Sequence, residues 1–145
     1  FYAVDLLGDI LGRGQSSRLY QTLVKDKNKF SSVNSYASGS IDKGLLVVEG
    51  KLNEGVTFEE AEQEMDEIVN NIGNEKLPDD LQKVKNQAES SLILGEVELI
   101  NRVMNIAFAV NMGKPDLVNT ESGLIQEVQV ADILRVKEEY LKEDN

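Results

Sequence analysis

Residues 30–52 carry the sequence FSSVNSYASGSIDKGLLVVEGKL, whose pattern differs from that of the segments on either side. Small, β-branched and aromatic residues alternate over 30–38, and Leu and Val dominate 45–52, which predicts two β-strands. The stretch from Gly39 to Gly44 has the composition of a turn, so we predict an antiparallel hairpin. A two-stranded sheet alone is marginally stable in water. We therefore expect further strands from residues outside these 145, or from edges with no clear strand pattern.

Two helices are predicted before the hairpin. Apolar residues at steps of three and four predict a helix over 2–11, and Gly12 and Gly14 are expected to end it. A second helix is predicted at about 17–27, with Ser16 as its N-cap. The hairpin would thus follow a pair of helices.

The segment after the hairpin begins with a helix start signal. Thr57 and Glu60 form a capping-box pair, in which a hydroxyl and a carboxylate three residues apart bond the first amides of a helix. We expect this helix to run to Ile72, where Gly73 closes it. Its predicted inward face consists of Phe58, Ala61, Met65, Ile68 and Val69.

A long helix is predicted over 79–112, because apolar residues there recur at an average step close to 3.6. From Ser91 onward it is apolar on most sides, which predicts burial. As one rod it would span ~51 Å, whereas a compact chain of this length has a diameter of about 38 Å. We therefore expect a bend or break at Gly95, with short helices at 119–127 and 131–142 finishing the chain.

The order of the predicted elements favours an α+β fold. Helices and strands are segregated along the chain, so a two-layer architecture is expected, with helices packed on one face of a mainly antiparallel sheet. The length of 145 residues fits one domain. Because the chain starts at Phe1 rather than Met, we expect it to be a fragment of a larger one.

Composition excludes several classes of chemistry. The chain has no Cys and no His, which removes disulfides, thiol catalysis and imidazole zinc sites. Its net charge is −11, spread as +2 over 1–52, −8 over 53–90 and −5 over 91–145. Nucleic acid is therefore not an expected partner, because its binding relies on Lys and Arg neutralising phosphates. No apolar run is long enough to predict a membrane span.

No segment shows a catalytic constellation. Gly12-Arg13-Gly14-Gln15 is similar to a phosphate-binding loop, but such loops follow a strand, and this one follows a predicted helix, so a helix–helix turn is the expected structure. Carboxylate pairs occur at 59/60, 79/80 and 138/139. Adjacent residues on a helix do not converge on one point, so we predict no catalytic residue and no metal ligand.

Three segments together resemble the pitrilysin/insulinase-type zinc peptidases, the family that includes mitochondrial processing peptidase. Residues 11–21, LGRGQSSRLYQ, are similar to the family signature LGGGxSSRLYQ. Residues 77–87, LPDDLQKVKNQ, are similar to its ELxKAKNQ helix, and Val130-Ala131-Asp132-Ile133-Leu134-Arg135-Val136 with Tyr140-Leu141 is similar to VTAEDIxRVAxxYL. Their order and separations also match, so the resemblance covers nearly the whole chain.

The resemblance implies the second, non-catalytic unit of such a peptidase. In the family, the first unit carries the zinc motif His-x-x-Glu-His, and the second keeps the fold and completes a peptide chamber. With no His, residues 1–145 are expected to form one inactive domain that holds no cofactor. Zinc is then expected only in a partner catalytic domain, in the same chain or another, and a peptide is the expected substrate. The family's flanking strands would lie outside 1–145.

The resemblance also places a substrate-binding region. Many relatives supply an Arg and a Tyr seven residues apart, which would fall at Val24 and Ser31, and neither type stands there. Lys25, Phe30 and Ser31 are therefore the candidate substrate-binding residues.

Two other functions stay open from the sequence. The first is a purely structural or interaction subunit, related to the family members that form the core of a respiratory complex without proteolysis. The second is an unrelated acidic adaptor that binds through its helices. The compartment is open as well, with periplasm and cytoplasm both compatible.

Overall fold

The computed structural model describes residues 1–39 and 44–142. Strands β1 (Phe30–Ser38) and β2 (Leu45–Leu52) pair antiparallel, with Phe30 opposite Leu52 and Ser38 opposite Leu45. The predicted hairpin is confirmed. Most of its predicted turn, residues 40–43, lies outside the described residues.

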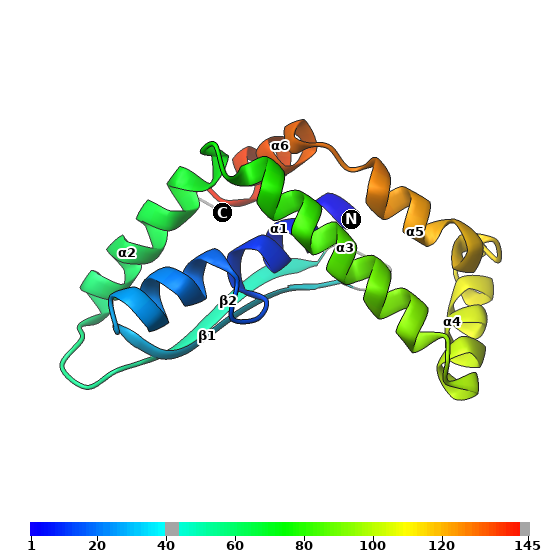
Figure 1. Ribbon diagram of the computed structural model, residues 1–145, viewed down its shortest axis with the longest axis horizontal. Coiled ribbons are helices and arrows are strands. Elements are labelled where there is room, and N and C mark those ends of the chain that lie inside the picture. The colour runs from blue at the N-terminus through cyan, green and yellow to red at the C-terminus, as the bar shows by residue number, and fades with distance from the viewer. Residues whose placement is uncertain (40–43, 143–145) are drawn as a thin grey trace.

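Helix α1 (Tyr2–Gly12) is the central element of the core. Every residue from Leu6 to Gly12 is buried. One side of α1 packs on the hairpin, and another packs on α3 (Leu77–Gly95) and α6 (Val130–Tyr140). Helices lie on one side of the hairpin (Figure 1), which confirms the α+β architecture.

The predicted helix end is confirmed, because α1 ends at Gly12, and Gly12 has a second role. It is the last residue of α1, and a Cβ there would lie 2.4 Å from the Ser35 backbone nitrogen on β1. The absence of a side chain is therefore what lets the helix approach the strand. Gly14 does form the turn that follows, with a φ of 78° that glycine adopts without strain.

The segment expected as a second α-helix is largely a π-helix. Element η1 spans Tyr20–Asp26, and the Lys27 amide bonds the Thr22 carbonyl five residues back at 2.9 Å. The predicted N-cap at Ser16 is wrong, because no side chain caps η1 and the neighbouring Ser17 hydroxyl donates to the Gly14 carbonyl at 2.7 Å. Over seven residues, the spacing of apolar side chains does not distinguish a π-helix from an α-helix.

Helix α2 (Phe58–Asn70) begins at the predicted N-cap. The Thr57 hydroxyl oxygen accepts a hydrogen bond from the Glu60 amide at 3.2 Å. Phe58 was expected to face inward and instead is 81% exposed. It is the first helical residue, ahead of the turn in which Ala61 meets the core. A short 3-10 helix, η2 (Asn71–Gly73), follows.

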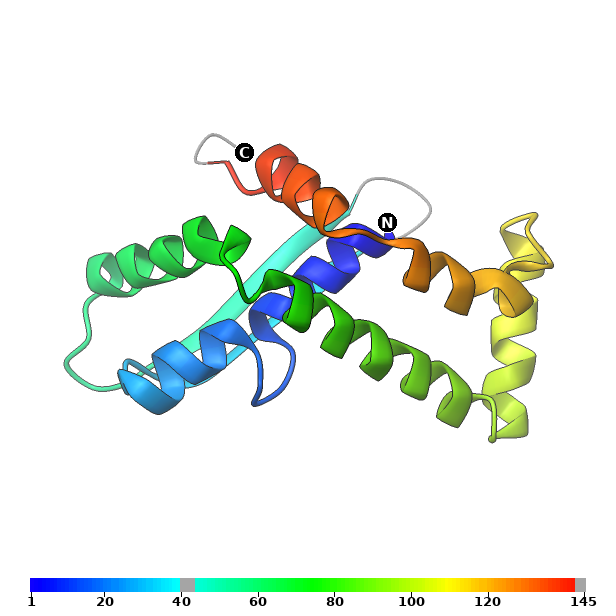
Figure 2. The ribbon, with the colours of Figure 1, turned by 45° about the horizontal axis from the view of Figure 1, so that its top comes forward.

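The predicted break in the long helix is confirmed. Helix α3 ends at Gly95, and α4 (Leu99–Asn111) starts after three residues in a new direction. Helix α5 (Leu117–Glu127) then returns toward the core, so that α3, α4 and α5 outline an arm (Figure 2).

The predicted burial of that second half is wrong. Leu99 is 75% exposed, and large apolar side chains are exposed along most of 93–110. The physical reason is the break itself, which directs α4 away from the core, so that α5 is the main element packed against it. Within residues 1–39 and 44–142, no helix combines the length and apolar character needed to cross a bilayer.

Candidate functional site

Three rare backbone features occur close together between residues 20 and 31. The first is the π-helix η1, which bears the candidate residue Lys25. The second is Asn28, a non-glycine residue with a φ of 50°. The third is a β-bulge, because Phe30 pairs with Leu52 while Ser32 pairs with the adjacent Lys51, which leaves Ser31 as the extra residue. Features of these kinds concentrate at functional sites, where they aim particular side chains.

Lys25 is the available cation of this segment. Two neighbouring lysines are bound to α2: the Lys27 ammonium pairs with Glu64, and the Lys29 ammonium lies 3.6 Å from Glu60. Lys25 is exposed, and in the part of the chain that the structure describes it has no ion-pair partner. The described residues therefore leave its charge exposed to solvent.

The other two candidates differ in accessibility. Ser31 is exposed, and its hydroxyl donates to the Lys51 carbonyl at 3.2 Å across the bulge. Phe30 is buried, and two of its ring carbons lie 2.7 Å from where a Cβ on Gly50 would stand. The structure thus brings Lys25 and Ser31 to the surface at the junction of η1 and β1, and places Phe30 in the core beneath them.

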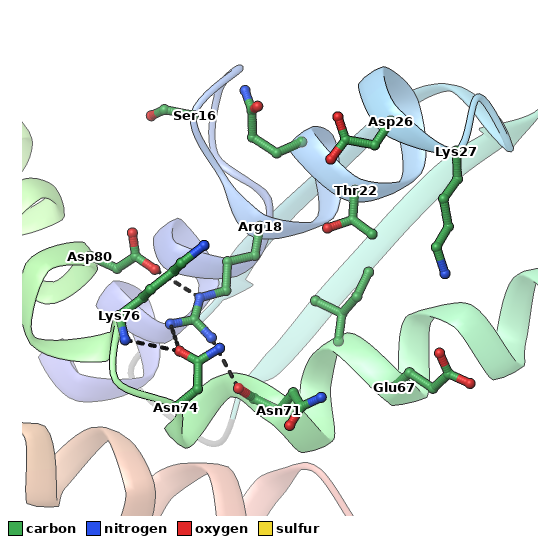
Figure 3. Close-up of a pocket in the computed structure, with 12 residues that line it drawn as sticks. Ser16, Arg18, Thr22, Asp26, Lys27, Glu67, Asn71, Asn74, Lys76 and Asp80 are labelled. Atoms are coloured by element: carbon green, nitrogen blue, oxygen red, sulfur yellow. Dashed lines mark hydrogen bonds and ion pairs between the residues drawn. The ribbon is translucent and has the colours of Figure 1, made fainter.

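A polar pocket of about 530 Å³ lies beside this junction, between η1, α2 and the start of α3 (Figure 3). Its walls mix both signs of charge, which suits a polar ligand better than an apolar one. The residues that line it are Ser16, Arg18, Gln21, Thr22, Asp26, Lys27, Glu67, Ile68, Asn71, Asn74, Lys76 and Asp80. Sequence reasoning did not find this pocket, because its walls come from segments far apart in the chain.

Arg18 holds one wall of that pocket together. Its Nε donates to Asp80 at 2.8 Å, and its two terminal nitrogens donate to the Asn71 carbonyl at 3.2 Å and the Asn74 side chain at 3.0 Å (Figure 3). The guanidinium is thus committed to structure rather than open to a ligand. The sequence did carry a signal, since Arg18 and Asp80 stand in two of the three motif-like segments.

Helix α1 carries a buried carboxyl group, Asp9, and a half-buried one, Asp5, apart from this pocket. Burial raises the pKa of Asp5 and of Asp9, and the nearby Arg13 guanidinium opposes the shift. Burial and the Glu121 carboxylate raise the pKa of Tyr2 to about 12. Over the described ranges, no three acidic side chains converge in a way that could hold a metal ion. These groups therefore carry structural consequences rather than acid–base chemistry.

Comparison with known families gives a match over residues 1–88, to the family described as the peptidase M16 inactive domain. That match covers more than half of the chain. It includes α1, η1, the hairpin and α2, and therefore the whole candidate junction.

Individual proteins and solved structures show a similarity of the same kind. The chain is 27% identical to an uncharacterized zinc protease, YmxG, of Bacillus subtilis, over 77% of this chain and 32% of the relative. It superposes on a protease of Helicobacter pylori with a TM-score of 0.86 at 20% identity, over 98% of this chain and 35% of that one. It also superposes on the inactive peptidase domain of a protein described as a zinc protease from Bordetella parapertussis, with a TM-score of 0.85 at 20% identity, over 100% and 79%. The chain thus spans about a third of the length of YmxG and of the Helicobacter protease.

Proposed function

Because this chain belongs to the family of peptidase M16 inactive domains, we propose that it completes the peptide chamber of a zinc protease, opposite a zinc-bearing catalytic domain. The family match over residues 1–88 is to an inactive peptidase domain, so this chain does not itself catalyse hydrolysis. In the proposal it acts as one domain of a larger assembly. Its contribution is to hold the peptide, since fixing the reacting groups relative to each other removes much of a barrier.

The uncovered face of the hairpin is the observation that carries this proposal. In residues 1–39 and 44–142, the helices pack on one side of the sheet (Figure 1). On β1, Ser32, Asn34 and Tyr36 are exposed, whereas Val33 and Ser35 are buried. A polar, uncovered sheet face is a suitable wall for a water-filled chamber that admits an extended peptide.

Lys25 and Ser31 are the proposed peptide contacts. Both lie near the start of β1. Ser31 is on the strand and offers a hydroxyl, and Lys25 is on η1, which packs against β1, and offers a cation with no ion-pair partner among the described residues. Phe30 would act from the core, as a positioning residue that fixes the bulge.

Zinc would be held by the partner alone. This chain has no His and no Cys, so it lacks the usual ligands of a zinc peptidase. When bound in the partner, the metal would activate water and polarise the peptide carbonyl. The part of this chain would be limited to orienting the peptide.

The test is peptide hydrolysis by the natural full-length protein and its catalytic partner. We expect Lys25→Ala to raise KM by about tenfold, the size of one lost charge-assisted contact, with little change in kcat. Ser31→Ala should have a smaller effect of the same kind. Lys142→Ala removes an exposed lysine far along the chain and serves as the matched control.

Two results would refute the proposal. The first is a catalytic unit that is fully active without this domain. The second is equal kinetics for the Lys25 and Lys142 variants, which would remove the junction from the site. Metal analysis of the separated units should find zinc only with the catalytic one, and a stoichiometric zinc on this chain would contradict that assignment.

A further inference from the structure

The strand register defines which side chains stand on the uncovered face of the hairpin. Residues directly opposite each other in an antiparallel pair share one face. The face toward α1 bears Ser35, which lies against Gly12, and the opposite residue Val48, which packs against the core. The uncovered face therefore bears the alternate pairs: Ser32 with Lys51, Asn34 with Glu49, and Tyr36 with Val47.

Along β2, the uncovered face changes character at every second residue. Val47 is apolar, Glu49 is an anion and Lys51 is a cation, and both charged side chains are exposed. Neither of the two has an ion-pair partner in residues 1–39 and 44–142. Because alternate residues of a strand stand roughly 6.8 Å apart, the three groups form a row of about 14 Å. Their order and their spacing are fixed by the strand.

The apolar end of this row is a small platform. Tyr36 stands opposite Val47 and is 42% exposed, and Leu45, the next residue on this face, is 71% exposed. In the described part of the chain, Leu46 and Val48 are the residues of this segment that pack on the core, and the three platform residues do not. An apolar side chain laid on the platform would lose contact with water, and an aromatic ring would also stack on Tyr36.

An extended peptide has the same spacing as the row. Its alternate side chains point to one side and recur every ~6.4–6.8 Å, so three of them can meet Val47, Glu49 and Lys51 together when the peptide lies along β2. Extended chains in facing layers run within about 30° of each other, which allows this arrangement. Complementary charge then requires a basic side chain over Glu49 and an acidic one over Lys51.

We propose that the uncovered face selects peptides in which an apolar, a basic and an acidic residue stand in this order at alternate positions, with the apolar residue on the platform. The inference rests on the proposed function, because it concerns the same peptide. Tyr36, Glu49 and Lys51 are then the residues that determine specificity. The acidic position falls beside the candidate junction, where the Ser31 hydroxyl bonds the Lys51 carbonyl.

Competition for the natural full-length protein with its catalytic partner tests this pattern. A fluorogenic peptide reports hydrolysis, and capped pentapeptides compete with it. The matched competitor is Phe-Ala-Lys-Ala-Glu and the exchanged one is Phe-Ala-Glu-Ala-Lys, each also made in reverse order because the peptide can run either way along β2. In one of the two directions, we expect the matched peptide to have an inhibition constant about tenfold below that of the exchanged peptide, since two surface ion pairs replace two repulsions.

Exchange of the charges in the protein is the decisive arm. Glu49→Lys combined with Lys51→Glu should invert the preference, so that the exchanged peptide becomes the better inhibitor by about tenfold. Both side chains are exposed, so the variant should keep its circular dichroism spectrum. Glu62→Lys combined with Lys142→Glu makes the same change at exposed positions outside the hairpin and should keep the original preference.

Two results would overturn the inference: no preference in either direction, or a preference that the hairpin variant retains. If hydrolysis still requires this domain in those cases, the proposed function stands and only the selection of peptides by charge is lost. A catalytic unit that is fully active alone would remove the proposed function itself.

The platform is tested separately. Tyr36→Ala should raise the inhibition constant of the matched peptide about fivefold, and replacing the Phe of that peptide by Ser should do the same. The two changes together should cause no further loss, because they remove one contact. Phe58→Ala removes an exposed aromatic side chain from α2 and should leave the inhibition constant unchanged. Losses that multiply would place the peptide's apolar residue elsewhere and overturn its assignment to the platform.

Discussion

Gly12→Ala is the substitution that tests the packing of α1 on the hairpin most directly. The added Cβ would lie 2.4 Å from the Ser35 nitrogen, 2.5 Å from the Ser35 Cβ and 2.8 Å from the Asn34 carbonyl carbon. Two of these three atoms are backbone atoms of a strand paired along its length. They cannot move without disturbing β1, so the helix must shift outward instead.

The expected size of this effect follows from two opposing terms. Overpacking of a core costs ~1–3 kcal/mol, and replacing a helical glycine by alanine returns at most ~1 kcal/mol. We therefore expect Gly12→Ala to lower the free energy of unfolding by about 1–2 kcal/mol. For a domain of this length, that lowers the melting temperature by roughly 3–8 °C.

Gly95→Ala is the matched control. Gly95 is also the last residue of a helix, and a Cβ there would meet nothing within 4 Å. The same chemical change should therefore leave stability unchanged or raise it by up to ~1 kcal/mol. Urea unfolding followed by circular dichroism measures both variants. Equal effects of the two substitutions would refute the close contact of Gly12 with β1.

Four further substitutions test other parts of the fold. Arg18→Ala should destabilise by about 1–2 kcal/mol, as urea unfolding would measure, because it removes the hydrogen bonds of the guanidinium and leaves the half-buried Asp80 carboxylate with Lys83 as its remaining charged partner. Leu99→Ala should cost less than ~0.5 kcal/mol, since the side chain is exposed; sequence reasoning alone, which buries it, predicts ~2–5 kcal/mol. Thr57→Ala should cost about 1 kcal/mol through loss of the helix cap. Asp9→Asn should stabilise the fold more at about pH 8 than at about pH 4. Burial raises the pKa of Asp9, so the native state disfavours the ionised carboxylate. This destabilisation is present above the pKa of Asp9 in the native state and absent below its pKa in the unfolded state.

Three of these variants, those at Arg18, Leu99 and Asp9, have an internal comparison. Arg135→Ala removes an exposed arginine whose partners are on its own helix, and it should cost under ~0.5 kcal/mol. Leu11→Ala, in the buried part of α1, should cost ~2–5 kcal/mol. Similar losses of stability for Leu11→Ala and Leu99→Ala would mean that the Leu99 side chain is buried in the native state, which contradicts its 75% exposure. A stability gain of the Asp9 variant that is the same at both pH values would contradict the burial of this carboxyl group.

The elements that the sequence predicted are those that local signals determine. The hairpin strands, the cap at Thr57 and the break at Gly95 depend on residues within a few positions of each other, and all three are confirmed. The resemblance to the family predicted an inactive peptidase domain from motifs of about ten residues each, and the family match confirms it.

The features that could not be predicted from the sequence depend on contacts between residues that are far apart in the chain. Arg18 and Asp80 are 62 residues apart, and the polar pocket exists only because η1, α2 and α3 meet. The extra residue of the bulge at Ser31 shows only in the pairing with β2. For α4 the apolar pattern correctly indicated a surface that prefers to be covered, but it did not show that this chain leaves it uncovered.

The central position of α1 also sets the order in which the chain can fold during synthesis. α1 packs on β1, which follows within a few tens of residues, but it also packs on α6, where Ile133 and Val136 are buried. About 120 residues separate the end of α1 from that contact. At translation rates of ~5–20 residues per second, the ribosome needs about 6–24 s to add them. During that interval, the side of α1 that later contacts α6 remains in water, available to chaperones.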